Sequence, residues 1–330
     1  MKVLPFPDKP ILLCYHNRAF PFGIIQANSP GDITKWACTK CINCNFFSER
    51  PLNKFNIAVY DAWGEEEQLV THQTLCLPKE SSQLSDEDLL QNLKSAIDNN
   101  CYISGIYNEK YIPGKLTYGF KDHIHDFLII GYDDKAFVSI GYVASGRFDQ
   151  FEIPISNLIT ALRTIPDARI KLNLFSYNSS TIPTPNVERM IEDLKKYIST
   201  ADYFYNPFPK VNVFGIASGA RLKMFFADEI QQGKIYVDIR YSLAFCEHKW
   251  ILTKLVELFL NGEEKKRYQE SANKNFEKAK IVHMLGLKMS CNRNASLINR
   301  ISKLMDEIII EEMSYIPSLI NLLQEKYSIN

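Results

Sequence analysis

The chain lacks an excess of charge of either sign, and it lacks any apolar run long enough to cross a membrane. Among its 330 residues, 38 are Lys or Arg and 38 are Asp or Glu. This balance argues against a nucleic acid partner, which needs a basic surface, and the missing run argues against a membrane partner. Prolines interrupt Met1–Pro7, so the segment lacks the apolar centre of a signal peptide. We therefore expect a cytoplasmic protein.

Several common catalytic motifs are also absent. There is no Gly-x-Ser-x-Gly turn, and the glycines around Gly215 and Gly219 do not form a phosphate-binding loop. The acidic residues between 306 and 312 lack the partner motifs of a carboxylate-bridged metal bundle, so a solvated helix face is expected for them. The sequence therefore predicts no cofactor.

Eight cysteines occur without an export signal, so thiols are expected rather than a disulfide framework. Three of them, Cys38, Cys41 and Cys44, form a C-x2-C-x2-C run. A metal site there would need a fourth ligand, for which the candidates are Cys76, His72 and His16. The alternative is packing, because cysteine is a small apolar side chain. We expect no bound metal, and the three cysteines remain rivals for a nucleophilic role.

A predicted β-hairpin carries a histidine at its mouth. His125 opens an apolar run that ends in Gly-Tyr and an acidic turn, and a second apolar run follows over Ala136–Val143. This pattern is typical of a buried hairpin, which is a rigid support for an imidazole. His123 would lie on the same face of the strand, because side chains repeat every second residue. His125 is preferred because it adjoins the apolar run.

Cys14 lies at the start of a predicted helix, which Pro21 and Gly23 are expected to shorten or kink. Free N–H groups at a helix start and a nearby imidazolium both lower the pKa of a thiol. Cys14 and His125 are therefore a candidate pair for nucleophilic catalysis. The structural alternative is a packed cysteine and a histidine that bonds to a loop.

The two halves of the chain have different patterns. The first mixes short strands and helices, including a helix capped by Ser85 and an edge strand over Ile170–Phe175. Tyr177–Pro185 is rich in Ser, Thr, Pro and Asn, which marks a boundary. We predict one domain over residues 1–178 and an α-helical domain over residues 179–330. Helices are expected around Asn212–Gln232, Val237–Gly262, Glu263–Leu287 and Asn294–Lys326, with Glu247 and His248 as a structural pair.

Together these motifs resemble the butirosin-biosynthesis-H N-terminal family of papain-like and C39-peptidase-like proteins. The matching segments are Cys14–Asn17, the His125 hairpin, Val213–Ile216, Cys246–Lys249 and Arg293–Ala295, so the resemblance covers most of the chain. It implies an α+β fold, in which a papain-like domain precedes a helical domain. It also implies an acyltransferase or amide synthase of antibiotic biosynthesis. Such an enzyme moves an acyl group from a carrier-protein thioester to its cysteine and then to an amine.

One residue of the papain-like pattern is missing. These enzymes place Asn or Asp on the strand returning from the histidine, to fix the imidazole tautomer, and that position falls near Gly141. Asp149 is the predicted third catalytic residue, Ser145 is an alternative to it, and a simple Cys–His dyad also remains open. The usual oxyanion glutamine is absent before Cys14. Asn17 and Tyr142 are therefore predicted to contact the oxyanion or the substrate, with the Cys14 N–H as a further donor.

The resemblance assigns Cys14 as the nucleophile and His125 as its base. An acyl-loaded carrier protein and an amine acceptor are the expected partners, and the substrate is expected where the two domains meet. Candidate contacts for an acidic carrier protein are Lys110, Lys115, Lys121 and Arg147. Two alternatives remain open: a peptidase or thioesterase of the same fold, and a non-catalytic protein that binds a carrier protein or a peptide.

Overall fold

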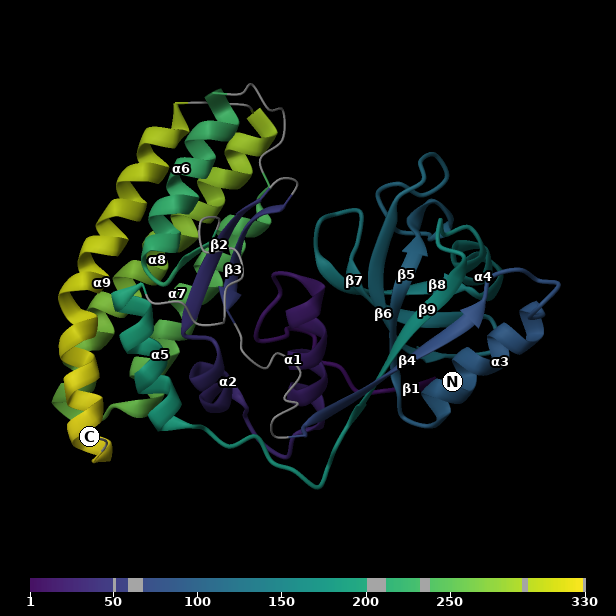
Figure 1. The fold of residues 1–330 in the computed structure, drawn as a ribbon, viewed down its shortest axis with the longest axis horizontal. Helices are drawn as coiled ribbons and strands as arrows, with labels where there is room; N and C mark the ends of the chain where they lie inside the picture. Colours follow the sequence, from purple (N-terminus) through teal and green to yellow (C-terminus); the bar gives the residue numbers. More distant parts are fainter. Residues whose placement is uncertain (50–51, 59–67, 201–211, 232–237, 293–295, 329–330) are drawn as a thin grey trace. The chain divides into compact units, whose positions relative to one another are not determined.

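The computed structural model describes residues 1–49, 52–58, 68–200, 212–231, 238–292 and 296–328 (Figure 1). It has a mixed α+β fold with a large antiparallel sheet. The chain divides into two compact units: unit 1 comprises residues 1–32 and 62–183, and unit 2 comprises residues 33–61 and 184–330. The predicted boundary at 178/179 lies close to the last change of unit, at 183/184. However, residues 33–61, which were predicted to be in the first domain, belong to unit 2.

Unit 1 is built on a seven-stranded antiparallel sheet with the order β4-β9-β5-β6-β7-β8, and β1 pairs with β6. Its strands are β1 (Lys2–Val3), β4 (Val70–Pro78), β5 (Tyr102–Asn108), β6 (Ile124–Tyr132), β7 (Ala136–Tyr142), β8 (Phe148–Pro154) and β9 (Arg169–Tyr177). Its helices are α1 (His16–Asn28), α3 (Asp86–Asp98), α4 (Ile155–Arg163) and the short 3-10 helix η1 (Glu109–Tyr111).

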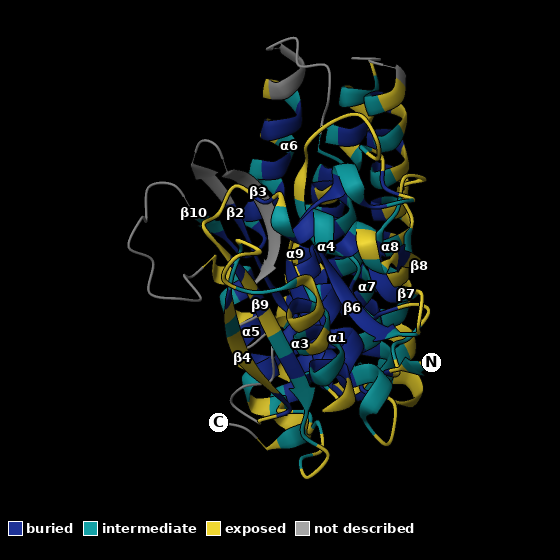
Figure 2. Cartoon of the chain, turned by 90° about the vertical axis from the view of Figure 1, so that its right-hand side faces the viewer, coloured by how far each residue is buried: buried dark blue, intermediate teal, exposed yellow. Residues whose placement is uncertain are grey.

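Local sequence explains most of these elements. The Ser85 hydroxyl accepts a hydrogen bond from the Asp88 N–H and caps α3, as the sequence predicted. The predicted hairpin is present as β6 and β7, and residues 127–131 of β6 are buried (Figure 2). The prediction of an edge strand over Ile170–Phe175 is wrong, because β9 lies between β4 and β5. Alternation of apolar and polar residues indicates only that one face of a strand is buried. Central and edge strands of a sheet with one solvated face both alternate, so the pattern does not identify an edge strand.

Helix α1 continues through Pro21 and Gly23 without interruption. Pro21 is the sixth residue of α1 and cannot donate the intrahelical hydrogen bond to the carbonyl of Asn17. Gly23 is needed for packing, because a Cβ there would lie only 2.2 Å from the Phe6 ring. This packing ties α1, the helix that follows Cys14, to the N-terminal segment of unit 1.

Unit 2 combines helices with a three-stranded antiparallel sheet in the order β10-β2-β3. Its strands are β2 (Asn43–Glu49), β3 (Leu52–Ala58) and β10 (Asn212–Phe214), and its helices are α2 (Thr34–Lys40), α5 (Val187–Ser199), α6 (Ala217–Gln231), α7 (Arg240–Phe259), α8 (Gly262–Asn292) and α9 (Leu297–Tyr327). The helical expectation for this half therefore needs a correction, since the unit also has a sheet. The helix predicted from Asn212 begins only at Ala217, after β10.

A buried ion pair lies among the helices of unit 2. Lys249 on α7 contacts Glu312 on α9 at 2.8 Å, and the Tyr197 hydroxyl on α5 donates to the same carboxylate at 2.7 Å. The side chains of both charged residues are almost completely buried. The three helices are thus joined by polar contacts inside the apolar core. The Arg293–Ala295 motif lies outside the described residues.

Candidate functional site

Cys14 lies two residues before the first residue of α1 and is buried. Tyr15 between them is the N-cap residue, and it has the unusual backbone angles φ 69° and ψ 122° with no side-chain cap. A non-glycine residue held at positive φ costs about 1–3 kcal/mol, and such residues concentrate at functional sites. The Arg18 and Ala19 amides donate to the Tyr15 carbonyl at 2.9 and 3.0 Å. The His16 and Asn17 amides, which are closer to Cys14, precede the first intrahelical hydrogen bond and can act as donors there.

His125 is the second residue of β6, as predicted, and its ring is about one-third exposed. Its Nδ1–H donates to the carbonyl oxygen of Asp126 at 3.1 Å. Nδ1 also lies 3.6 Å from a carboxylate oxygen of Asp126 and 3.6 Å from one of Glu109. These contacts place the proton on Nδ1, which leaves Nε2 as the basic nitrogen. Burial lowers the pKa of His125, against the opposing effect of the two carboxylates.

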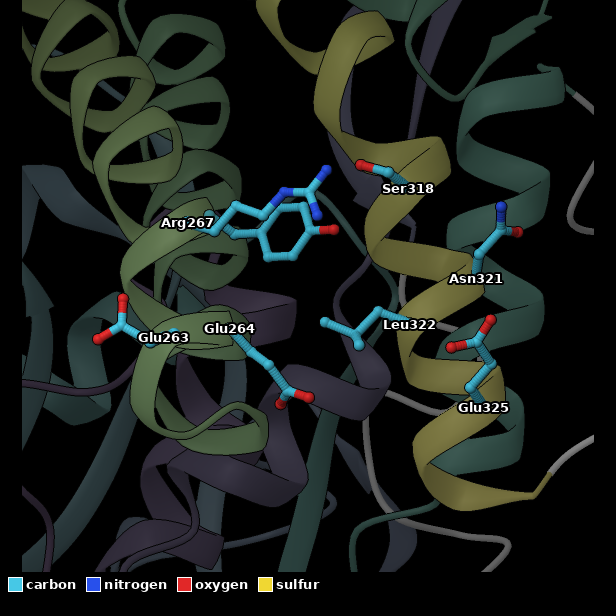
Figure 3. Close-up of a pocket in the computed structure, with 8 residues that line it drawn as sticks. Glu263, Glu264, Arg267, Ser318, Asn321, Leu322 and Glu325 are labelled. Carbon is cyan, nitrogen blue, oxygen red and sulfur yellow. The ribbon is translucent and has the colours of Figure 1, made fainter.

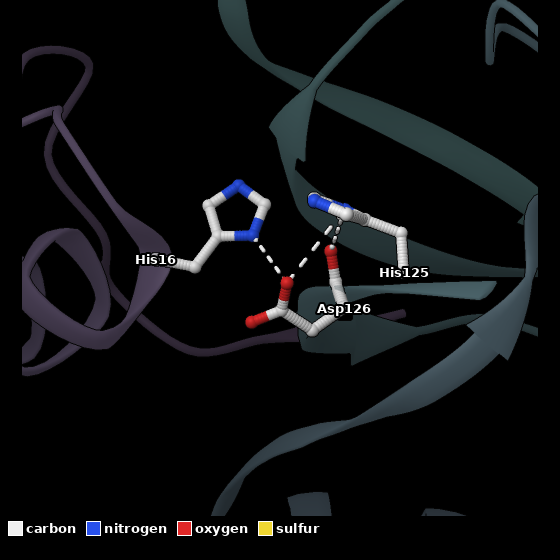
Figure 4. A group of neighbouring side chains, drawn as sticks. All are labelled: His16, His125 and Asp126. Carbon is white, nitrogen blue, oxygen red and sulfur yellow. Dashed lines mark hydrogen bonds and ion pairs between the residues drawn. The ribbon is translucent and has the colours of Figure 1, made fainter. Parts of the chain in front are cut away.

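The sequence did not single out Asp126 or His16 as a catalytic pair. His16 Nδ1 lies 2.9 Å from Asp126 Oδ1, and the His16 and His125 ring centroids are 5.2 Å apart (Figure 4). Burial favours a protonated Asp126, but the hydrogen bond from His16 and the nearby His125 outweigh it and lower the carboxyl pKa. The only sequence signal for this pair was that Asp126 directly follows His125.

Gly141 occupies the position at which the papain-like pattern has Asn or Asp. A Cβ added at Gly141 would lie 3.6 Å from Lys115 Nζ and 3.8 Å from His16 Cε1. These two distances are ordinary contacts, and the tightest neighbour of the added Cβ would be Phe127 Cβ at 3.2 Å. The carboxylates beside His125 come instead from η1 and from β6 itself.

Asp149, the predicted third catalytic residue, lies on β8 directly opposite Gly141. Its carboxylate contacts Arg147 at 3.2 Å, and about half of its side chain is exposed. Ser145, the alternative, accepts a long hydrogen bond from Arg147 at 3.4 Å. Asp126 and Glu109 are therefore the acids that the structure brings to His125.

Two buried charged side chains, Glu109 and Lys115, lie near His125. Glu109 is buried and contacts His123 Nδ1 at 2.7 Å and Lys115 Nζ at 3.4 Å. Lys115 is also buried and donates to the Tyr142 carbonyl at 2.6 Å. Burial lowers the pKa of Lys115, and Glu109 opposes that shift. Glu109 thus links His125 on β6 and His123, which precedes that strand, through Lys115 to the returning strand β7.

Tyr142 connects the hairpin to the segment that carries Cys14. Its hydroxyl donates to the Leu13 carbonyl at 2.9 Å, and its ring stacks on His16 with centroids 5.5 Å apart. The prediction placed Tyr142 at the oxyanion or the substrate, and the structure gives its hydroxyl this backbone partner. Asn17, the other predicted contact, is exposed on the first turn of α1.

A groove of about 560 Å³ opens beside His125 and Asp126, wholly within unit 1. It runs over β4, β9, β5 and β6, and it is lined by Thr74, Ser104, Gly105, Ile106, Ile124, His125, Asp126, Lys171 and Asn173. This volume suits a small molecule or an extended chain. The mixture of isoleucines with hydroxyl, amide and ammonium groups suits a partly apolar ligand that has polar groups along its length.

The cysteine run does not form a metal site in the part of the chain that the structure describes. Cys38 lies on α2, Cys41 follows that helix, and Cys44 is on β2; all three are buried in unit 2. Cys44 contacts the Ser218 hydroxyl at 2.9 Å, and burial raises its pKa to about 12. Such a thiol is almost never ionised at neutral pH, which makes Cys44 a poor nucleophile. The candidate fourth ligands, including His16, belong to unit 1.

A second hollow, of about 410 Å³, lies between α8 and α9 in unit 2 (Figure 3). Its wall combines Glu263, Glu264 and Glu325 with Arg267 and Tyr268. Glu264 is already paired with Lys326 at 3.1 Å. None of the residues that line this hollow is a histidine or a cysteine, so the groove beside His125 is the better candidate for a reactive site.

Comparison with protein-family models gives no match to this chain, and comparison with curated protein sequences gives none either. Within the described ranges, none of the helices has both the length and the hydrophobicity of a transmembrane span. The site residues must therefore be interpreted from their own geometry.

Proposed function

We propose that this chain is a cysteine-dependent acyltransferase that forms amide bonds, with Cys14 as its nucleophile and His125 as its base. The observation that carries the proposal is the link between Cys14 and the hairpin. Tyr142 binds the residue before Cys14, and His16, two residues after Cys14, binds Asp126 next to His125. The two segments that supply the nucleophile and the base are thereby held together from both sides.

The His125 tautomer supports this assignment. With its proton on Nδ1, facing the Asp126 carbonyl and two carboxylates, the imidazole presents Nε2 as a proton acceptor. A cysteine–histidine enzyme requires this arrangement, because the base must first take the thiol proton and then return it. Asp126 and Glu109 stabilise the imidazolium that forms after the first transfer.

The reaction has two stages. His125 accepts the Cys14 proton, the thiolate attacks the acyl carbon of a thioester, and the donor thiol leaves with the proton from the imidazolium. An amine then attacks the acyl-cysteine, its proton passes to His125, and the Cys14 thiolate leaves and takes that proton back. Amides at the start of α1 are suitable donors to the oxyanion of each tetrahedral intermediate.

A thioester donor fits a site with an unusual third residue. A thiol leaves more readily than an amine, so the enzyme needs less help from a precisely oriented acid than a peptidase does. We infer from the resemblance that unit 1 has a papain-like fold. We also infer that the donor is an acyl chain on a carrier protein in antibiotic biosynthesis, as for the papain-like amide synthase of closthioamide assembly. The eight free thiols are consistent with a cytoplasmic setting.

The proposed basic contacts for a carrier protein need revision. Lys115 is buried against Glu109, Lys110 lies 3.6 Å from Asp122, and Arg147 pairs with Asp149. Lys121 is exposed. Exposed apolar side chains on the same loop, Leu116, Tyr118 and Phe120, offer an alternative contact surface beside the site.

Intact-protein mass spectrometry tests the proposal. The native protein, Cys14→Ala and the matched control Cys76→Ala, which changes an exposed cysteine, are incubated with an aromatic acyl thioester. We expect one acyl adduct on the native protein and the control, and none on Cys14→Ala. Discharge of the adduct by a diamine faster than by water would identify a transferase, whereas faster discharge by water would indicate the hydrolase alternative. Absence of any adduct would contradict the proposal and favour the binding protein.

A further inference from the structure

We propose that His16, His125 and Asp126 bind a divalent transition metal ion, with Zn²⁺ the best match, and that the bound ion switches off acyl transfer. One nitrogen of each imidazole and one carboxylate oxygen lie within 4.8 Å of one another (Figure 4). The metal-binding part of this inference stands on geometry alone. Its inhibitory part rests on the function proposed above.

The donor set matches zinc chemistry. Two imidazole nitrogens and one carboxylate oxygen, with a fourth position open to water, form a common zinc site with three protein ligands. Ligands about 2.1 Å from one tetrahedral ion lie about 3.4 Å apart. The longest separation must therefore shorten by no more than about 1.4 Å. Rotation of the partly exposed His125 ring, at the beginning of its strand, can supply this change.

The hydrogen bonds around the cluster leave ligand positions open. His125 uses Nδ1 for the Asp126 carbonyl and faces Glu109 at 3.6 Å, so its Nε2 lone pair is available. In metal sites, a histidine that binds the ion through one ring nitrogen usually donates the N–H of its other ring nitrogen to a carbonyl or a carboxylate. His16 is buried, and its Nε2 has no hydrogen-bond partner among the described residues. In the metal-free protein the His16 Nδ1–H donates to Asp126, so the ion would either displace that proton or bind His16 through Nε2.

The local charge also favours a cation. Asp126 and Glu109 both lie close to His125, whereas the neighbouring Lys115 is engaged with Glu109 and with the Tyr142 carbonyl. An ion placed between the imidazoles would neutralise Asp126 and take the lone pair that His125 needs as a base. Binding of the metal and removal of the Cys14 proton therefore exclude one another.

The test titrates metal-free protein with Zn²⁺ in a calorimeter and follows Co²⁺ binding by absorption. The native protein is compared with His16→Gln and Asp126→Asn, and with the matched controls His72→Gln and Asp149→Asn on other strands of unit 1. We expect one saturable site in the native protein and in both controls. Affinity should fall about 10-fold or more in the two ligand variants, with thermal melting unchanged.

Cys14→Ser separates this proposal from the previous one. It should bind Zn²⁺ like the native protein, although it forms no acyl adduct. In the native protein, Zn²⁺ should slow acyl transfer, and a chelator should restore it. The metal site is excluded if the native protein has no saturable site, if His72→Gln weakens binding as much as His16→Gln does, or if Asp126→Asn binds normally. None of these failures would alter the acyl adduct expected at Cys14.

Discussion

The Tyr142 hydroxyl on β7 donates a 2.9 Å hydrogen bond to the carbonyl of Leu13, the residue directly before Cys14. A hairpin strand thereby fixes the backbone of a segment that is far away in sequence. This contact, together with the bond between His16 and Asp126, is the basis of the site described above.

Tyr142→Phe should slow formation of the acyl-cysteine without abolishing it. One neutral hydrogen bond contributes about 0.5–1.5 kcal/mol, which corresponds to a rate loss of about 2- to 12-fold if the bond serves only to position Cys14. Quenched-flow mass spectrometry measures this rate. Tyr327→Phe, which removes a tyrosine hydroxyl that donates to the Phe259 carbonyl in unit 2, is the control and should behave like the native protein. Equal rates for Tyr142→Phe and the native protein would show that the contact does not position the nucleophile.

Asp126→Asn and Asp149→Asn separate the structure-based assignment from the sequence-based one. Asp126 lies beside both histidines, whereas Asp149 pairs with Arg147. We expect acylation to fall by about 100-fold or more in Asp126→Asn, because an uncharged amide no longer stabilises the imidazolium. Asp149→Asn should retain the native rate. The reverse result would restore Asp149 as the third catalytic residue.

Glu312→Gln should destabilise unit 2 strongly. The change leaves the Lys249 ammonium buried without a counterion, which typically costs about 3–5 kcal/mol. Denaturant unfolding followed by tryptophan fluorescence measures the loss. Glu263→Gln breaks an exposed ion pair with Lys266 and should cost less than about 1 kcal/mol. The double variant Lys249→Met with Glu312→Leu should recover most of the stability, and a failure to recover would show that the pair has a role beyond charge balance.

The stability of unit 2 should decrease as the pH falls below about 6.5. His248 is buried, and its Nε2–H donates to the Ile42 carbonyl at 2.6 Å. Burial and the neighbouring Lys249 hold the His248 pKa well below its usual value. The unfolded chain therefore takes up a proton that the folded protein does not, and stability is lost by up to about 1.4 kcal/mol per pH unit until the folded pKa is reached.

His248→Gln tests this dependence, because glutamine can donate to the same carbonyl but does not titrate. Urea unfolding between pH 7 and pH 5 should have a flatter pH dependence in this variant than in the native protein. His72→Gln replaces an exposed histidine and is the control. An unchanged slope in His248→Gln would assign the acid sensitivity to other groups.

Local signals in the sequence predicted local features well. The Ser85 cap, the hairpin and the helix after Cys14 each depend on neighbouring residues, and each is present. The order of strands was not predictable in this way: β9 pairs with β4, whose residues lie about a hundred positions earlier. The placement of residues 33–61 in unit 2 depends likewise on pairing between β2 and β10, which a local pattern does not report.

The same distinction applies to the site. Cys14 and His125 were found because each adjoins a recognisable element. Asp126 was overlooked because it follows His125 directly, and neighbouring side chains on a regular strand point to opposite faces. At the start of β6, however, both residues lie beside His16 of α1, and His125 also lies near Glu109 of η1. His16 lacked a sequence signal of its own, since its partner is 110 residues away.

Locating the acyl group is the most direct test of the central claim. The native protein is loaded with an aromatic acyl thioester, quenched in acid before the adduct is discharged, digested, and analysed by tandem mass spectrometry. The account predicts a single acylated peptide, with the acyl group on Cys14. An acyl group on Cys38, Cys41, Cys44 or any other side chain, with Cys14 unmodified, would contradict it.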